Sequence, residues 1–194
     1  MPNFAAFLAY VLISCFSPGP NTIISMTNAG RYGFKKGIRF NMGIFFGVLI
    51  LTTLCSIFTM ALYNFIPSIK PVMASLGAAY ILWLAWKIFT SKPEGGDTTR
   101  RPTNSFLFGM LLQFVNPNAI LYSITTLSTF VVPYYKSAAM LNIFCLFMAS
   151  IAFGATCCWA LFGSAFQRFI VKNNKIVNTI MALLLVYCAV SLFL

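Results

Sequence analysis

Ser17-Pro18-Gly19-Pro20-Asn21 interrupts an otherwise apolar segment that begins near Phe4 and ends near Ile24. Each proline lacks a backbone N–H and its ring crowds the carbonyl four residues earlier, so the pair around Gly19 breaks a helix. In hydrocarbon, the freed backbone groups are costly unless protein or water pairs with them. We therefore expect this broken helix to line a cavity within a membrane, the alternative being a simple kink without chemical use.

The composition is that of a membrane protein. The chain has 194 residues, of which 60% are hydrophobic and 8% charged, with 21 Phe and a mean hydropathy of +0.87. A soluble domain of this length cannot bury so much apolar surface, so we predict one all-α integral membrane domain over residues 1–194, embedded in the lipid bilayer. The net charge of +11 comes from basic residues in short gaps between apolar runs, which argues against a nucleic-acid partner.

Six apolar runs are each long enough, at roughly 20 residues, to cross a bilayer as a helix. They lie at 4–24 (continuing to about 29 past the break), 38–63, 71–90, 105–130, 138–164 and 175–194. The two halves, about 1–91 and 104–194, would be joined by a linker at 92–103 that contains Gly95-Gly96-Asp97. The predicted fold is therefore six transmembrane helices with short connecting loops.

Basic residues are distributed unevenly among the five connections. Of the 13 Lys and Arg residues, 11 lie in or beside the first, third and fifth connections, whereas the second and fourth hold one each, Lys70 and Lys136. Basic residues mark cytoplasmic loops. Both termini are therefore predicted to face the opposite side of the membrane.

A second interruption, Gln113-Phe114-Val115-Asn116-Pro117-Asn118, lies in the fourth apolar run. With an outward N-terminus, the two halves of three helices have opposite topologies, and the interrupted segments 1 and 4 correspond to each other. Both interruptions fall near the middle of a hydrocarbon core about 30 Å thick. Paired breaks of this kind indicate a 3+3 inverted-repeat transporter with its site at the midplane.

The ends of broken helices provide unpaired N–H donors and carbonyl acceptors, which suit the carboxylate and ammonium groups of an amino acid. Amide and hydroxyl side chains near the breaks add further donors and acceptors, although each amide could instead only cap a helix end. The candidate substrate-binding residues are Ser17, Pro18, Gly19, Pro20, Asn21, Gln113, Asn116, Pro117, Asn118 and Tyr122, with Ser123 a further hydroxyl nearby.

Acidic and histidine side chains are missing from the predicted spans. Glu94 and Asp97, the only acidic residues, lie in a predicted loop, and the chain has no histidine. A cationic substrate would lack a counter-ion, and coupling to protons would need a thiol, the substrate itself or held water. The six cysteines form no CxxC pair, so we expect no metal and no cofactor. The residue sets of intramembrane hydrolases are also missing, which argues against an enzyme.

The SPGPN stretch, the glycine-rich turn after it and Gln113-Phe114-Val115-Asn116-Pro117 resemble the LysE/RhtB family of bacterial amino-acid exporters. Residues 78–87, 127–131 and 183–190 look most like its cysteine/O-acetylserine exporter branch. The resemblance implies efflux of a small amino acid across the bacterial inner membrane, driven by protons, with periplasmic termini. It departs at Asn118, where many members have lysine.

Other functions stay open at this point. The exported solute could be homoserine or threonine, and the chain could be a small channel or a membrane module without turnover. Gly43 and Gly47 form a small-residue face on the second run, which favours close helix packing around the first break. Exposed aromatic faces and small-residue stripes would permit a homodimer.

Overall fold

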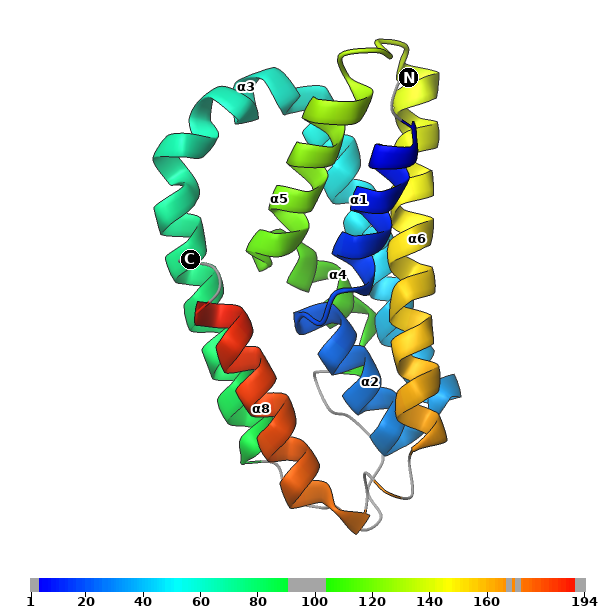
Figure 1. Ribbon diagram of the computed structural model, residues 1–194, viewed down its shortest axis with the longest axis vertical. Helices are drawn as coiled ribbons and strands as arrows, with labels where there is room; N and C mark the ends of the chain where they lie inside the picture. Colours follow the sequence, from blue (N-terminus) through cyan, green and yellow to red (C-terminus); the bar gives the residue numbers. More distant parts are fainter. Residues whose placement is uncertain (1–3, 91–103, 167–168, 170–171, 191–194) are drawn as a thin grey trace.

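The computed structural model describes residues 4–90, 104–166, 169 and 172–190, and the predicted linker 92–103 lies outside this part. Helices fill the described chain, without a strand, which confirms the predicted all-α class (Figure 1). They are α1 (Phe4–Phe16), α2 (Pro20–Tyr32), α3 (Phe34–Phe89), α4 (Phe106–Val115), α5 (Pro117–Thr126), the π-helix η2 (Leu127–Val131), α6 (Ala138–Ala165) and α8 (Asn174–Val190).

Both predicted helix breaks are present. α1 and α2 meet at 49° across Ser17–Gly19, and α4 meets the α5–η2 segment at 68° across Asn116. A proline occupies the first position of α2 and of α5, where the missing N–H costs no hydrogen bond. Figure 1 shows the two broken segments running in opposite directions, as inverted halves require.

The predicted spans 38–63 and 71–90 belong to one helical element, α3, rather than to two helices joined by a loop. Figure 1 shows α3 rising along the bundle, turning over at the top and descending beside α8. The expected loop is helical because backbone hydrogen bonding continues through the bend, which satisfies each N–H without a change of structure. The two predicted spans nevertheless run in opposite directions, as expected (Figure 1).

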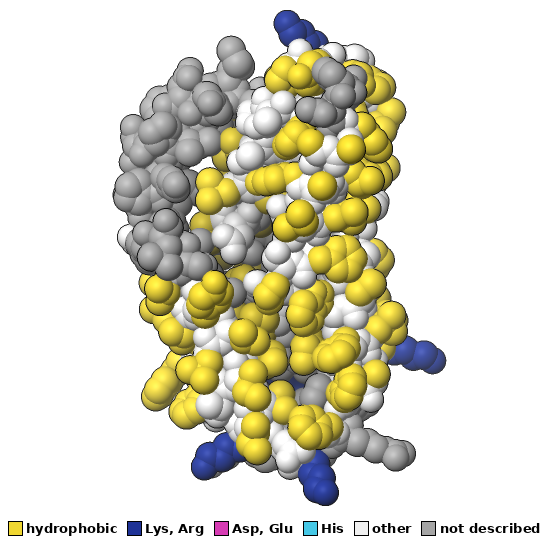
Figure 2. All heavy atoms as spheres, in the orientation of Figure 1, with side chains coloured by type: hydrophobic (Ala, Val, Ile, Leu, Met, Phe, Trp, Pro, Cys, Tyr) yellow, Lys and Arg dark blue, Asp and Glu magenta, His cyan; other side chains and the backbone are white. Residues whose placement is uncertain are grey.

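Length and composition support several membrane crossings. Within the described residues, Phe34–Phe58 and Ala138–Ala165 are each long and apolar enough to span, and each bent pair passes the same test when its two helices are taken as one span. Large apolar side chains such as Ile13, Ile57, Trp86 and Leu183 point outward. Figure 2 shows apolar side chains over most of the visible face, with Lys and Arg toward its two ends. The chain is a multi-span membrane protein.

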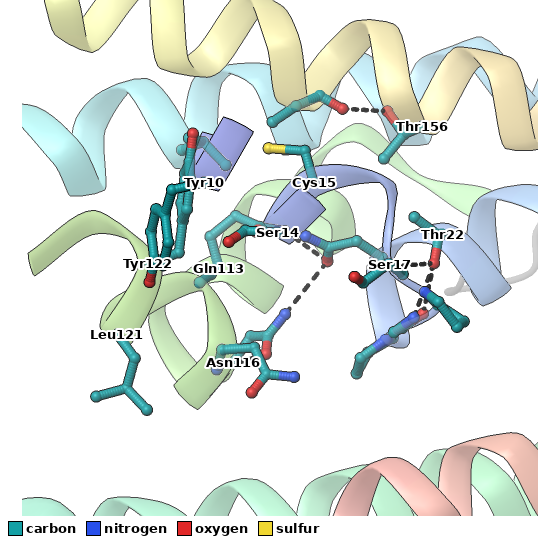
Figure 3. A pocket seen from close by; sticks show the side chains of 18 residues that line it. Tyr10, Ser14, Cys15, Ser17, Thr22, Gln113, Asn116, Leu121, Tyr122 and Thr156 are labelled. Atoms are coloured by element: carbon teal, nitrogen blue, oxygen red, sulfur yellow. Dashed lines mark hydrogen bonds between the residues drawn. The ribbon is translucent and has the colours of Figure 1, made fainter. Parts of the chain in front are cut away.

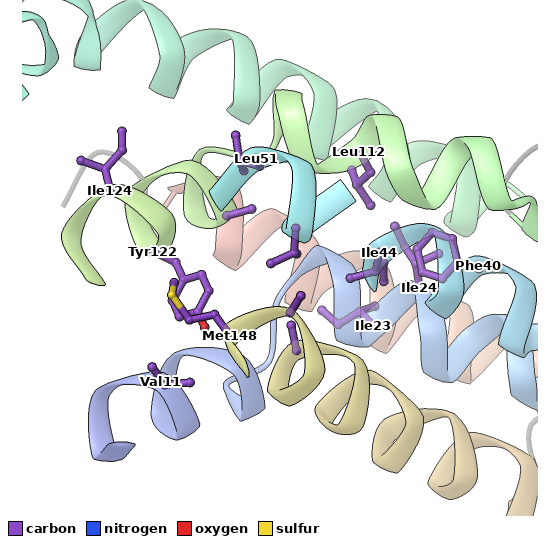
Figure 4. Packing of buried hydrophobic residues seen from close by; sticks show 14 of the residues in the cluster. Val11, Ile23, Ile24, Phe40, Ile44, Leu51, Leu112, Tyr122, Ile124 and Met148 are labelled. Carbon is purple, nitrogen blue, oxygen red and sulfur yellow. The ribbon is translucent and has the colours of Figure 1, made fainter. Parts of the chain in front are cut away.

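Aromatic packing holds α1 against the second half of the chain. Phe7 is fully buried, and its ring centroid lies 6.1 Å from that of Phe130, 5.6 Å from that of Phe144 and 6.0 Å from that of Phe147. Figure 4 shows the same core continuing to Val11 and Met148, around the ring of Tyr122. This packing fixes the N-terminal part of α1, which leads to the break.

Glycines allow α3 and α4 to touch through their backbones. A Cβ on Gly43 would lie 2.0 Å from the Phe106 carbonyl oxygen, and one on Gly109 would lie 2.3 Å from the Phe40 carbonyl oxygen. Gly43 and Gly47 therefore serve close helix packing within the chain, as expected from the sequence, and the homodimer stays a prediction.

Candidate functional site

The two breaks meet at one cavity of about 300 Å³ (Figure 3). All predicted site residues line it except Pro117. Ser123 is also outside the lining, because its hydroxyl turns back to the Ala119 carbonyl oxygen at 2.7 Å within α5. The structure thus brings together two sequence stretches almost 100 residues apart, Asn21 and Gln113 being separated by 92 positions.

The first break is closed by local hydrogen bonds. The Gly19 N–H donates to Thr22 Oγ1 at 2.9 Å, and the Thr22 hydroxyl lies 3.0 Å from the Gly19 carbonyl oxygen. Before the break, the Ser17 hydroxyl donates to the Ile13 carbonyl oxygen at 2.6 Å. Thr22 therefore holds the start of α2 in place. The Ser17 side chain bonds the carbonyl four residues earlier, as a helical N–H would, and so extends the hydrogen bonding of α1.

The second break is a single residue, Asn116. Its Oδ1 accepts from the Asn118 N–H at 3.2 Å, so Asn116 caps the N-terminus of α5. Its Nδ2 lies 3.5 Å from Asn21 Oδ1 across the cavity wall. Capping and a contact with the other break are thus combined in one side chain.

A reciprocal amide pair joins the two breaks. Asn21 Nδ2 donates to Gln113 Oε1 at 2.9 Å, and Gln113 Nε2 donates to Asn21 Oδ1 at 3.1 Å. Gln113 is fully buried and also donates to the Gly109 carbonyl oxygen at 2.9 Å. Gly47 makes room for it, because a Cβ there would lie 2.6 Å from Gln113 Cγ. The pair therefore couples the positions of α2 and α4.

We expect Gln113→Leu to lower transport at least about tenfold, because it leaves the Asn21 amide without its main partner at a cost of about 1–3 kcal/mol. Asn21→Leu is the matched variant, and the double variant completes a cycle. If the two amides act as a pair, flux in liposomes falls no further in the double variant than in either single one. Losses that add independently would contradict a coupled pair.

Backbone groups without helical partners belong to residues that line the cavity. The first turns of α2 and α5 leave the N–H groups of Thr22 and Ala119 without an intrahelical acceptor, and the last turn of α1 leaves the Cys15 carbonyl without an intrahelical donor. All three residues line the cavity. Within the described residues, no charged side chain does. The lining can therefore bind a zwitterion through neutral groups and helix ends.

The sequence did not predict the parts of the wall that lie outside the two breaks. Tyr10, Ser14 and Cys15 line the cavity from α1, and Thr156 lines it from α6. Tyr10 and Ser14 are one helical turn apart and lead to Ser17, a spacing that could have identified this face of α1. The sequence contains no comparable signal for Thr156, since its place depends on how α6 packs.

A second polar cluster lies beyond the cavity, between α2, α3 and α6. The buried Ser25 hydroxyl is 2.6 Å from Asn41 Oδ1 and 2.8 Å from the Thr156 carbonyl oxygen. Asn41 Nδ2 in turn lies 3.7 Å from Cys157 Sγ. These bonds join α2, α3 and α6 next to the cavity wall at Thr156.

Comparison with known proteins gives full-length matches. The family model of the LysE type translocators matches residues 12–194. The chain is 41% identical over 189 residues to the cysteine/O-acetylserine efflux protein of Salmonella typhimurium (strain LT2), covering 97% of this chain and 96% of the relative. The proteins of the same name from Escherichia coli (strain K12) and Klebsiella pneumoniae are each 39% identical, over 97% of this chain and 96% and 95% of the relatives. No solved structure matches the chain.

These matches confirm the resemblance inferred from the two interrupted segments and the functional class predicted with it. A translocator family and relatives named as efflux proteins indicate a membrane transporter rather than an enzyme. The family match includes both breaks and all the residues that line the cavity except Tyr10. The chain belongs to the LysE type translocator family.

Proposed function

We propose that this chain exports small neutral amino acids, cysteine and O-acetylserine being favoured, across the bacterial inner membrane by alternating access. The observation that carries the proposal is the cavity between two broken helices of opposite direction, lined by neutral polar groups. The names of the relatives support the choice of substrates.

The breaks suit the two charged groups of an amino acid. The substrate carboxylate would accept from N–H groups at the starts of α2 and α5, where both helix dipoles are positive. The ammonium group would donate to carbonyl groups at the end of α1 and to amide oxygens of the wall. A volume of about 300 Å³ is at the small end of ligand sites, which fits a substrate of few heavy atoms.

A cationic amino acid fits the site poorly. A lysine or arginine side chain would bring a second positive charge, and the described lining offers it no carboxylate. Transfer of an unpaired charge into this environment is expensive. Neutral side chains are therefore favoured, which agrees with the thiol and the O-acetyl group of the two proposed substrates.

Alternating access would require hydrogen bonds between the two halves to break and reform. The candidates are the Asn21–Gln113 amide pair and the cluster around Ser25. In this conformation the Ser25 hydroxyl bonds Asn41 of α3 and the Thr156 backbone of α6, so it joins the two halves of the chain. We propose that the halves rock around the breaks so that these bonds open. The end of α2 and the start of α3 carry Arg31, Lys35 and Lys36, which supports a cytoplasmic location for that end and periplasmic termini.

The test is counterflow of labelled cysteine and O-acetylserine in liposomes that contain the purified protein, with and without a pH gradient. We expect saturable uptake that unlabelled substrate competes away, and a response to the gradient if protons are coupled. Saturable flux restricted to homoserine or threonine would replace the proposed substrates. Flux that does not saturate would indicate a channel, and no flux of any of these solutes would contradict a transporter.

A further inference from the structure

Three side chains from α1 and α5 form one end of the cavity. Tyr10 and Cys15 come from α1, and Tyr122 comes from α5. Figure 3 shows the two tyrosine rings side by side, on the opposite side of the cavity from Ser17 and Thr22. The two tyrosine rings are thus placed apart from the starts of α2 and α5, where the substrate carboxylate is proposed to bind, and Cys15 lies between them and the break (Figure 3).

The Tyr122 hydroxyl is a buried polar group of the wall that lacks a suitable partner. The residue is 8% exposed, and its buried hydroxyl makes no hydrogen bond to an oxygen or nitrogen of the described chain. Its polar neighbour is the Cys15 thiol, a weak donor and acceptor. Three other polar side chains of the wall do have partners: Gln113 bonds Asn21, Asn116 bonds the Asn118 backbone, and Thr22 bonds the Gly19 backbone.

Packing prevents Tyr122 from turning to another partner. Its ring belongs to the buried core with Val11 and Met148, as Figure 4 shows. Its backbone is also held, since its carbonyl oxygen accepts from the Thr126 hydroxyl at 2.6 Å. A buried hydroxyl that is fixed at a cavity and lacks a strong partner is costly unless a ligand supplies one.

We propose that the Tyr122 hydroxyl, beside the Cys15 thiol, binds the heteroatom of the substrate side chain and selects amino acids that carry one. The inference rests on the proposed function, because the carboxylate and ammonium groups must be held at the breaks for the side chain to reach Tyr122. A phenol can donate to a hydroxyl, a thiol or an ester carbonyl, and it can accept from the first two. It has no such partner in the methyl side chain of alanine.

The test compares Tyr122→Phe with the wild-type protein, since this change removes a single oxygen. Competition by unlabelled cysteine, O-acetylserine and alanine in counterflow gives their relative apparent affinities. We expect the preference for cysteine and O-acetylserine over alanine to fall about tenfold, with alanine itself little affected. Tyr134→Phe is the matched control, because Tyr134 is 52% exposed and lies outside the cavity wall.

A structural role would give a different result. Loss of an unpartnered buried hydroxyl should leave the unfolding temperature of the ligand-free protein unchanged or raised. An equal fall for all three amino acids, or no change in preference, would overturn the inference. Stabilisation of the purified protein against heat by each amino acid provides a readout that needs no flux. If the wild-type protein were stabilised selectively by cysteine and O-acetylserine but did not transport them, the proposed export would fail. Loss of that selective stabilisation in Tyr122→Phe would then still support the role of Tyr122 in binding, which needs only that the breaks hold the amino acid.

Discussion

Gly43→Ala should strongly destabilise the folded protein, although it adds a single methyl group. The new Cβ would lie 2.0 Å from the Phe106 carbonyl oxygen and 2.9 Å from the Met110 backbone nitrogen. Both are backbone atoms, so no side-chain rotation relieves the overlap, and α3 and α4 must separate. Overpacking of this kind costs about 1–3 kcal/mol or more, a large part of the typical stability of about 5–15 kcal/mol.

The separation would also reach the site. α4 carries Gln113, which packs against Gly47 one helical turn beyond Gly43 on the same face of α3. A shift of α4 would lengthen the hydrogen bonds between Gln113 and Asn21. The fraction of Gly43→Ala that remains folded should therefore transport less than the wild type.

Gly154→Ala is the matched control, because a Cβ on Gly154 meets no heavy atom within 4 Å. It is also a glycine in a helix interior, where alanine has the better helix propensity. Thermal unfolding in detergent and the amount of monodisperse protein extracted from membranes measure the difference. Equal stability of the two variants would show that α3 and α4 do not need this close approach.

The helix breaks could be predicted because their cause is local. Proline chemistry at residues 18, 20 and 117 is sufficient to end a helix wherever the segment lies. Their meeting could be predicted too, because corresponding segments of inverted halves place their centres at the same depth. The structure adds the pairing of Asn21 with Gln113, which depends on the rotation of each half-helix about its axis.

Other features depend on packing and were not predictable from the sequence. The continuous helix at the turn of α3 and the π-helix at Leu127–Val131 replace an expected loop and an expected α-helix. Tyr10 and Cys15 resemble ordinary apolar-face residues of a membrane helix, and their position in the wall follows from the contact of Phe7 with α6. Asn41 and Ser25 become a pair only when α2 and α3 lie side by side.

Gly19→Leu should abolish transport and leave the protein folded. The Gly19 backbone is extended, with φ −161° and ψ −179°, a conformation open to any residue. A Cβ there would meet no heavy atom closer than the Ser17 carbonyl oxygen at 4.0 Å. Glycine is therefore not needed for the turn itself, and its value lies in the cavity space that it leaves free.

Leucine at this position would place four carbon atoms in a cavity of about 300 Å³. They would lie beside the N-terminus of α2, where the substrate carboxylate is proposed to bind, and would exclude it from the N–H groups. We expect a fall in counterflow of more than about tenfold, because a carboxylate held away from charge-assisted donors loses about 1.5–3 kcal/mol of binding energy per bond.

Gly19→Ala separates occupied volume from backbone freedom. Both variants keep the Gly19-position N–H that donates to Thr22 Oγ1, and both keep an extended backbone. Alanine should retain most of the flux if volume is decisive, whereas both variants should fail equally if the turn must flex through glycine-only conformations during transport. Wild-type flux in Gly19→Leu, at wild-type abundance and unfolding temperature, would show that the substrate binds elsewhere. The two variants thus test the site and the movement of the break independently, since only the second depends on the conformational range of residue 19.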